Sequence, residues 1–133
     1  MKIIKENVNL INEEYLIEMA RVGFIDKNKL EIYVRTNDAG KIPHFHIWDT
    51  STRRDKFHSC IKIEVPEYFP HEGKEDVLNA KQIKDLLKFF KTSPLKTTRY
   101  DNNWQVLLDM WNLNNSDINV DTNLEIPDYN LLK

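Results

Sequence analysis

The sequence predicts an α+β domain: an antiparallel sheet of about four strands packed on two C-terminal helices and followed by a polar C-terminal tail. Three observations support this fold class. The first half of the chain carries runs rich in β-branched and aromatic residues, separated by turn-forming residues. The second half carries two amphipathic stretches with helical spacing. The last stretch, 112–133, has four acids against a single lysine and is too polar for a core helix.

The predicted strands come from the β-branched and aromatic runs. We expect strands at 30–35, 43–48 and 57–65, and a fourth strand within 15–25, at least from Met19 onward. The fourth assignment has an alternative, because Asn12 followed by two glutamates could begin a helix. The apolar run from Val22 to Ile25, directly before an Asp-Lys-Asn turn, favours a strand that forms a hairpin with the next one.

The two amphipathic stretches predict the helices. Asn79 can cap the first helix, with Gln82 at the capping-box position. Asp101 or Asn102 can cap the second helix, which we expect to end at Trp111, before the asparagine-rich 112–115. The apolar residues that recur at i, i+3, i+4 and i+7, and that we expect to pack on the sheet, are Ile83, Leu86, Leu87 and Phe90 in the first helix and Trp104, Leu107, Leu108 and Trp111 in the second.

Length and composition indicate a single domain over 1–133. A chain of 133 residues with 41% hydrophobic and 30% charged residues can bury a core without a disulfide or a metal. We expect an N-terminal arm, a sheet, a loop, two helices and an acidic tail, at 1–14, 15–65, 66–78, 79–111 and 112–133. The apolar residues of the tail could dock along the domain or onto a second copy of the chain.

Composition also excludes several classes of protein. A net charge of −2 lacks the basic footprint of a dedicated nucleic-acid binder. No run of 18 apolar residues is present, and the opening MKIIKENVNL lacks the features of a signal peptide, so we expect neither a membrane protein nor a secreted one. One cysteine cannot form an internal disulfide, which fits a reducing compartment, and we expect a cytoplasmic protein.

Histidines and the single cysteine converge on one face of the predicted sheet. We assume that the hairpin joining the strands of this region is symmetric about Thr52. This register pairs His46 with His58 and His44 with Cys60. Imidazole and thiolate are zinc ligands, so these four residues are the candidate metal site. A shift of the register by one residue would move His58 and Cys60 to the other face.

The same face has a second interpretation, in which it binds no metal and is solvated or covered by the tail or a partner. We expect no cofactor, with a divalent metal such as zinc as the alternative, because zinc sites usually show more closely spaced Cys or His pairs. A bound metal would acidify a water molecule, and Glu31 or Glu64 could act as the base. No catalytic residue is assigned beyond this alternative.

The polar face also gathers cations and aromatic side chains. The candidate residues for contact with a partner are Tyr33, Arg35, Trp48, Arg53, Arg54 and Lys62. They could bind a bacterial protein, or a phosphate or nucleotide ligand, because cations bind phosphate and aromatic rings stack on bases. An exposed charged turn is the ordinary alternative for Arg53 and Arg54. A homodimer is a further alternative for the assembly.

The segment GKIPHFHIW resembles the domain-of-unknown-function family 4160, small prokaryotic α+β proteins with a Pro-Pro-His-x-His strand. The likeness covers about Ala20 to Trp111. The chain is also similar to uncharacterised phage and mobile-element proteins that share the PHFHI, VPEYF and HxGKEDVLN patterns. Family 4160 has two consecutive prolines before the first His, whereas this chain has Ile42 before Pro43. The His that this family carries just before the motif is also absent. The resemblance implies a fold and a toxin–antitoxin setting, and it assigns no reaction to His44 or His46.

These observations lead to one functional hypothesis and two alternatives. We expect a small phage or mobile-element accessory protein with an anti-defence role, which binds a host-defence or toxin–antitoxin component. Whether the protein is an enzyme is open, and a non-enzymatic binding protein is favoured because no catalytic motif is present. The first alternative is a metal-dependent hydrolase that uses His44, His46 and His58. The second is a protein that sequesters small nucleotides.

Overall fold

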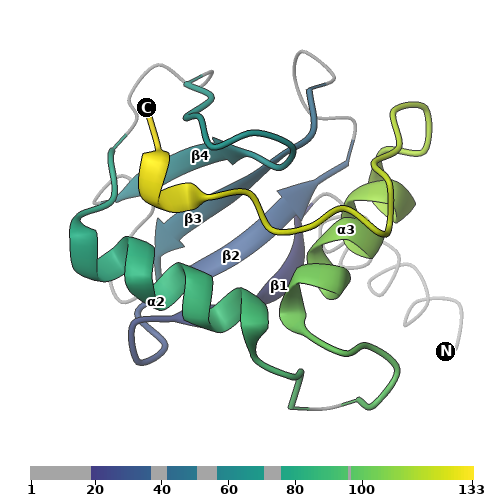
Figure 1. Cartoon of the computed structure of the whole chain (residues 1–133), viewed down its shortest axis with the longest axis horizontal. Coiled ribbons are helices and arrows are strands. Elements are labelled where there is room, and N and C mark those ends of the chain that lie inside the picture. The colour runs from purple at the N-terminus through teal and green to yellow at the C-terminus, as the bar shows by residue number, and fades with distance from the viewer. Residues whose placement is uncertain (1–18, 37–41, 51–56, 71–75, 96) are drawn as a thin grey trace, which may run out of the picture.

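The structure of the chain, a computed structural model, describes residues 19–36, 42–50, 57–70, 76–95 and 97–133 (Figure 1). Four strands form one antiparallel sheet in the order β1-β2-β3-β4. Their bounds are β1 Met19–Ile25, β2 Leu30–Arg35, β3 His44–Asp49 and β4 His58–Lys62. Two helices follow, α2 Ala80–Lys91 and α3 Asn103–Asn114, and then a 3₁₀ turn, η2 Tyr129–Leu131. The predicted α+β class is confirmed.

A hydrophobic core lies between one face of the sheet and the elements that follow it. Figure 1 shows α2 and the C-terminal segment in front of the sheet, with α3 beside them. Ile32, Phe45 and Ile61 of the sheet are fully buried and belong to the same cluster as Leu86 of α2 and Leu107 of α3. The alternation of apolar and polar residues along each strand therefore orients one face toward this core. No helix in the described ranges is long and apolar enough to cross a membrane.

The first hairpin agrees with the strand interpretation of the 15–25 segment from Met19 onward, and 15–18 lie outside the described residues. Its turn residues Asp26, Lys27 and Asn28 all have positive φ, a conformation that Asn and Asp tolerate better than most residues. A β-bulge at Val22 shifts the register. Arg21 pairs with Tyr33 and Gly23 with the adjacent Ile32, so Val22 is the extra residue in β1.

Replacing Gly23 with alanine is expected to lower the free energy of unfolding by about 1–3 kcal/mol, as overpacking of a core does. Gly23 lies opposite Ile32 in the sheet. A Cβ at this position would stand 2.5 Å from Cζ of Phe89, so the ring of α2 would have to move. Chemical denaturation followed by tryptophan fluorescence measures the change. An alanine variant as stable as the wild type would show that the ring moves freely.

Both helices begin where the sequence predicts. Asn79 forms the expected capping box, because its side chain accepts from the backbone N–H of Gln82 and the Gln82 side chain accepts from the Asn79 N–H. Asn102, one of the two candidates, caps α3 and accepts from the Gln105 N–H. Two ends differ from expectation: α3 continues to Asn114 instead of stopping at Trp111, and β4 ends at Lys62 instead of Val65.

The longer α3 has a physical reason in the side chains of its asparagines. Asn112 donates to the carbonyl of Val120 and accepts from its N–H, so the amide that was expected to break the helix is paired with the tail. Asn115 ends the helix instead, since its amide donates to the carbonyl of Arg35 at 2.8 Å. Asparagine disfavours helices because its side-chain amide competes for the hydrogen bonds of nearby backbone groups. Here the amides of Asn112 and Asn115 bond instead to backbone groups far along the chain.

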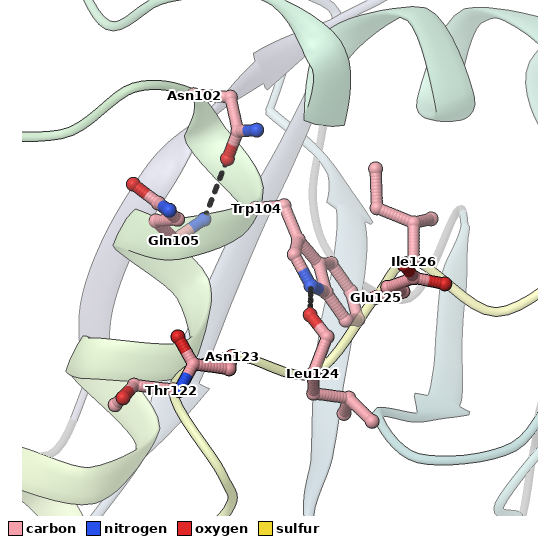
Figure 2. A pocket seen from close by; sticks show the side chains of 8 residues that line it. All are labelled: Asn102, Trp104, Gln105, Thr122, Asn123, Leu124, Glu125 and Ile126. Carbon is pink, nitrogen blue, oxygen red and sulfur yellow. Dashed lines mark hydrogen bonds between the residues drawn. The ribbon is translucent and has the colours of Figure 1, made fainter.

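The tail docks along its own domain, one of the two predicted alternatives. Val120 is 4% exposed and Tyr129 is fully buried, although the tail as a whole is polar. The indole of Trp104 donates to the carbonyl of Leu124 at 2.7 Å. Figure 2 shows this bond in an open pocket between the start of α3 and the tail. This pocket shares no residue with the histidine face described next, and its lining residues are Asn102, Trp104, Gln105, Thr122, Asn123, Leu124, Glu125 and Ile126.

Candidate functional site

The face of the sheet opposite the core carries two rows of polar and aromatic side chains. Strand pairing places one row across all four strands and a second beside it. The first row is Arg21, Tyr33, His46 and Cys60, and the second is Phe24, Glu31, Trp48 and His58. Residues two apart on a strand share a face, so the two rows lie side by side. The predicted division of residues between the two faces is therefore correct.

The predicted register between β3 and β4 is wrong by two residues. His46 faces Cys60, and His44 faces Lys62, where we expected His58 and Cys60. The cause lies at the hairpin, because the Asp49 N–H donates to the carbonyl of Phe57 and so centres the connection one residue beyond Thr52. A shift of two residues keeps every side chain on its face, whereas a shift of one would reverse them. The histidines and Cys60 therefore share a face in the observed register as well as in the predicted one.

His46, His58 and Cys60 form a compact group of potential metal ligands. His46 Nδ1 lies 3.0 Å from His58 Nε2 and 3.1 Å from Cys60 Sγ. Cys60 Sγ lies 3.8 Å from His58 Nε2. His58, opposite Trp48, is the diagonal neighbour of His46 across the strands, a distance that long side chains cover, and Cys60 lies two residues along the same strand as His58. The group could hold a metal ion.

Tyr33 holds the imidazoles in place from the neighbouring strand. Its ring stacks on His46 with centroids 4.8 Å apart and an interplanar angle of 16°. His46 stacks in turn on His58 at 5.2 Å and 19°. The Tyr33 hydroxyl lies 3.4 Å from His58 Nε2, and the backbone N–H of His58 donates to Asp76 Oδ2 at 2.9 Å. The His46 ring is therefore packed between the rings of Tyr33 and His58.

His44 belongs to the same face but lies outside the three-residue group. Its Nδ1 lies 2.6 Å from the carbonyl of Ile42, which orients the ring toward the start of β3. The ring contacts Phe69 edge-on, with centroids 4.7 Å apart, and is fully buried. Of the four predicted metal ligands, the structure brings three together and gives His44 a packing role.

Glu31 sits beside the group in a separate hydrogen-bond network. One of its carboxylate oxygens accepts from the Trp48 indole at 2.6 Å, and the other accepts from Arg21. Glu31 is 6% exposed, so this network supplies the polar partners that a buried carboxylate requires. Arg21 was not singled out from the sequence, although its place in the strand before the first turn puts it beside Glu31. Glu64, the other proposed base, is exposed.

The centre of the polar face is enclosed, so the solvated alternative does not hold there. Tyr33 and His46 have no exposed surface, Cys60 has 1% and His58 has 6%. Among the predicted contact residues, those that stand around this centre and keep partial exposure are Arg35, Trp48 and Lys62. Lys62 donates to Glu67 at 2.8 Å, and this pairing lowers the pKa of the Glu67 carboxyl. The proposed contact residues Arg53 and Arg54 lie outside the described residues.

Comparisons with protein-family models, with curated proteins and with solved structures give no match to this chain. The resemblance to family 4160 therefore stays a prediction that rests on the PHFH segment and the order of its neighbours.

Proposed function

We propose that this chain is a small binding protein that recognises a bacterial protein, with Arg35, Trp48 and Lys62 at the contact. One observation carries the proposal: the reactive groups of the polar face are enclosed, while an arginine, a tryptophan and a lysine around them keep exposed surface. Turnover needs access to the reactive groups, whereas binding needs only the surrounding side chains. Tryptophan and arginine are also the residue types most enriched at binding hot spots.

Two of the three side chains contact buried residues of the domain. The Arg35 guanidinium lies 5.9 Å from the centroid of the Tyr33 ring, and the Trp48 indole donates to Glu31. Preorganised side chains lose less entropy on binding than mobile ones. Two cations at the margin favour an acidic partner surface. In the setting that the resemblance implies, this partner is a host-defence or toxin–antitoxin component, and the chain is a phage or mobile-element accessory protein.

Charge reversal tests the proposed contact surface. Tagged wild-type protein and an Arg35→Glu variant are tested by calorimetry against the proteins encoded beside its gene. Lys88→Glu on α2 is the control, because Lys88 carries the same charge and is exposed but lies on the helical side. We expect Arg35→Glu to weaken one of these interactions at least tenfold, or about 1.4 kcal/mol, and the control to leave it unchanged. Equal affinity of the wild type and Arg35→Glu for every partner that binds would contradict the proposal.

A metal-dependent hydrolase is the second candidate function, since His46, His58 and Cys60 could hold a divalent ion. A site with three protein ligands can leave a position for a reactive water. Phosphodiester hydrolysis by the zinc-loaded protein that is lost in His58→Asn, with folding intact, would favour it over binding. Nucleotide sequestration, which would use Arg35 with Arg53 and Arg54, is tested by calorimetry against signalling nucleotides.

A further inference from the structure

We infer that His46, His58 and Cys60 bind one zinc ion, which fastens the edge strand β4 to β3. The site differs from the proposed contact surface, because its ligands are buried at the centre of the face and the contact residues stand around it. It also differs from the four-residue set expected from the sequence, since His44 is not part of it. The inference goes beyond the binding function and does not depend on it.

The spacing of the three ligand atoms fits a single ion. Their separations are 3.0, 3.1 and 3.8 Å, and the centre of the triangle that they form lies about 2 Å from each atom, the length of a Zn–N bond. In a tetrahedral zinc site the N···N and N···S separations are about 3.3 and 3.6 Å, so each pair needs to move by roughly half an ångström or less. This adjustment is within the reach of side-chain rotation.

The chemistry of the three atoms favours a metal ion over protons alone. Two imidazole nitrogens and a sulfur lie close to one another, and each is an atom type that binds transition metals. A shared proton can link only two of these atoms by a hydrogen bond, whereas one metal ion between them can coordinate all three. Two imidazoles and a thiolate are a soft, nitrogen-and-sulfur ligand set, which suits zinc and disfavours magnesium and calcium.

The packing around the ligands supports the same assignment. A zinc-binding imidazole is usually oriented by contacts to the rest of its ring. Tyr33 stacks on His46, and Asp76 anchors the backbone of His58. The first contact restricts the His46 ring and the second holds the backbone that carries His58, and both lower the entropy cost of binding an ion.

The proposed role of the ion follows from the sheet order. β4 is the edge strand of the sheet, with β3 as its one neighbour among the four strands. His46 comes from β3, and His58 and Cys60 come from β4, so the ion links the two strands across the face away from the core. Zinc binding would therefore stabilise the folded chain and raise its Tm.

The test uses the purified full chain. We expect one zinc per chain by elemental analysis, and X-ray absorption at the zinc edge with one sulfur at about 2.3 Å and two imidazole nitrogens at about 2.0–2.1 Å. After removal of zinc by a chelator, cobalt(II) titration should saturate at one equivalent with a thiolate-to-cobalt charge-transfer band. Adding zinc back should raise the Tm of the wild type.

Three variants locate the site. Cys60→Ser should lose the charge-transfer band and the zinc-dependent rise in Tm. Ser59→Ala should retain both, because Ser59 is equally buried on the same strand but lies on the core face. His44→Gln should also retain one zinc.

The X-ray absorption measurement needs no variant, so it decides the question even if Cys60→Ser fails to fold. Zinc without a sulfur ligand, or no metal after exposure to zinc and cobalt, would overturn the inference, and neither result would bear on the contact surface around Arg35.

Discussion

Replacing Phe90 with alanine lowers the free energy of unfolding by about 3–5 kcal/mol, the range for deleting a fully buried phenylalanine ring. Phe90 is fully buried on α2, at the meeting point of the sheet, α3 and the tail. Its ring packs edge-on against Phe45 at 5.5 Å and against Trp104 at 5.0 Å. The Tyr129 ring lies 6.2 Å away. Because three aromatic rings cannot all move into the space that Phe90 leaves, a cavity remains and further lowers the free energy of unfolding.

Denaturation in urea, followed by tryptophan fluorescence and by circular dichroism, measures the loss for Phe90→Ala. The matched control is Lys91→Ala, the next residue of the same helix, which is exposed and should change the stability by less than about 0.5 kcal/mol. A loss below about 1.5 kcal/mol for Phe90→Ala would mean that the helix repacks and that the tail does not hold it in place.

The fold was predictable because its signals are local. The capping box at Asn79 and the helical spacing of Leu86 and Phe90 depend only on neighbours in the chain, and the structure confirms them. The end of α3 was not predictable in the same way, since Asn112 is tolerated inside the helix only through its pairing with Val120, eight residues later. Patterns of neighbouring residues do not indicate such a distant partner.

The candidate site was predictable in its residues and less so in its geometry. Strand alternation placed His46, His58 and Cys60 on one face, and that placement survives any even shift of the register. The true pairing depends on where the hairpin centre falls, which sequence symmetry about Thr52 did not locate. Burial was not predictable either, because a strand with polar residues on one face looks the same whether that face is covered or open.

Replacing Tyr129 with alanine is expected to lower the free energy of unfolding by about 3–5 kcal/mol, since it removes a buried aromatic ring and its hydrogen bond. Tyr129 is fully buried in the tail, and its hydroxyl lies 2.9 Å from the carbonyl of Lys62 and 3.0 Å from that of Ile63. The hydroxyl donates to these two carbonyls where β4 ends. Tyr129→Phe keeps the ring but removes the hydroxyl, and should lower the free energy of unfolding by about 1–3 kcal/mol because two buried carbonyls lose their donor.

The same hydroxyl predicts how stability depends on alkaline pH. Burial raises the pKa of Tyr129 well above its usual value of 10.0, so the folded chain keeps the proton after the unfolded chain has released it. The stabilisation is fully present below about pH 10, the pKa in the unfolded chain, and falls above it by up to about 1.4 kcal/mol per pH unit. Tyr68 and Tyr100 also have raised pKa values, so the wild type is compared with Tyr129→Phe, in which those two groups are unchanged. Denaturation curves between pH 8 and 11.5 should show the two proteins converging in stability above about pH 10. A constant difference across that range would mean that the Tyr129 hydroxyl reaches water in the folded state.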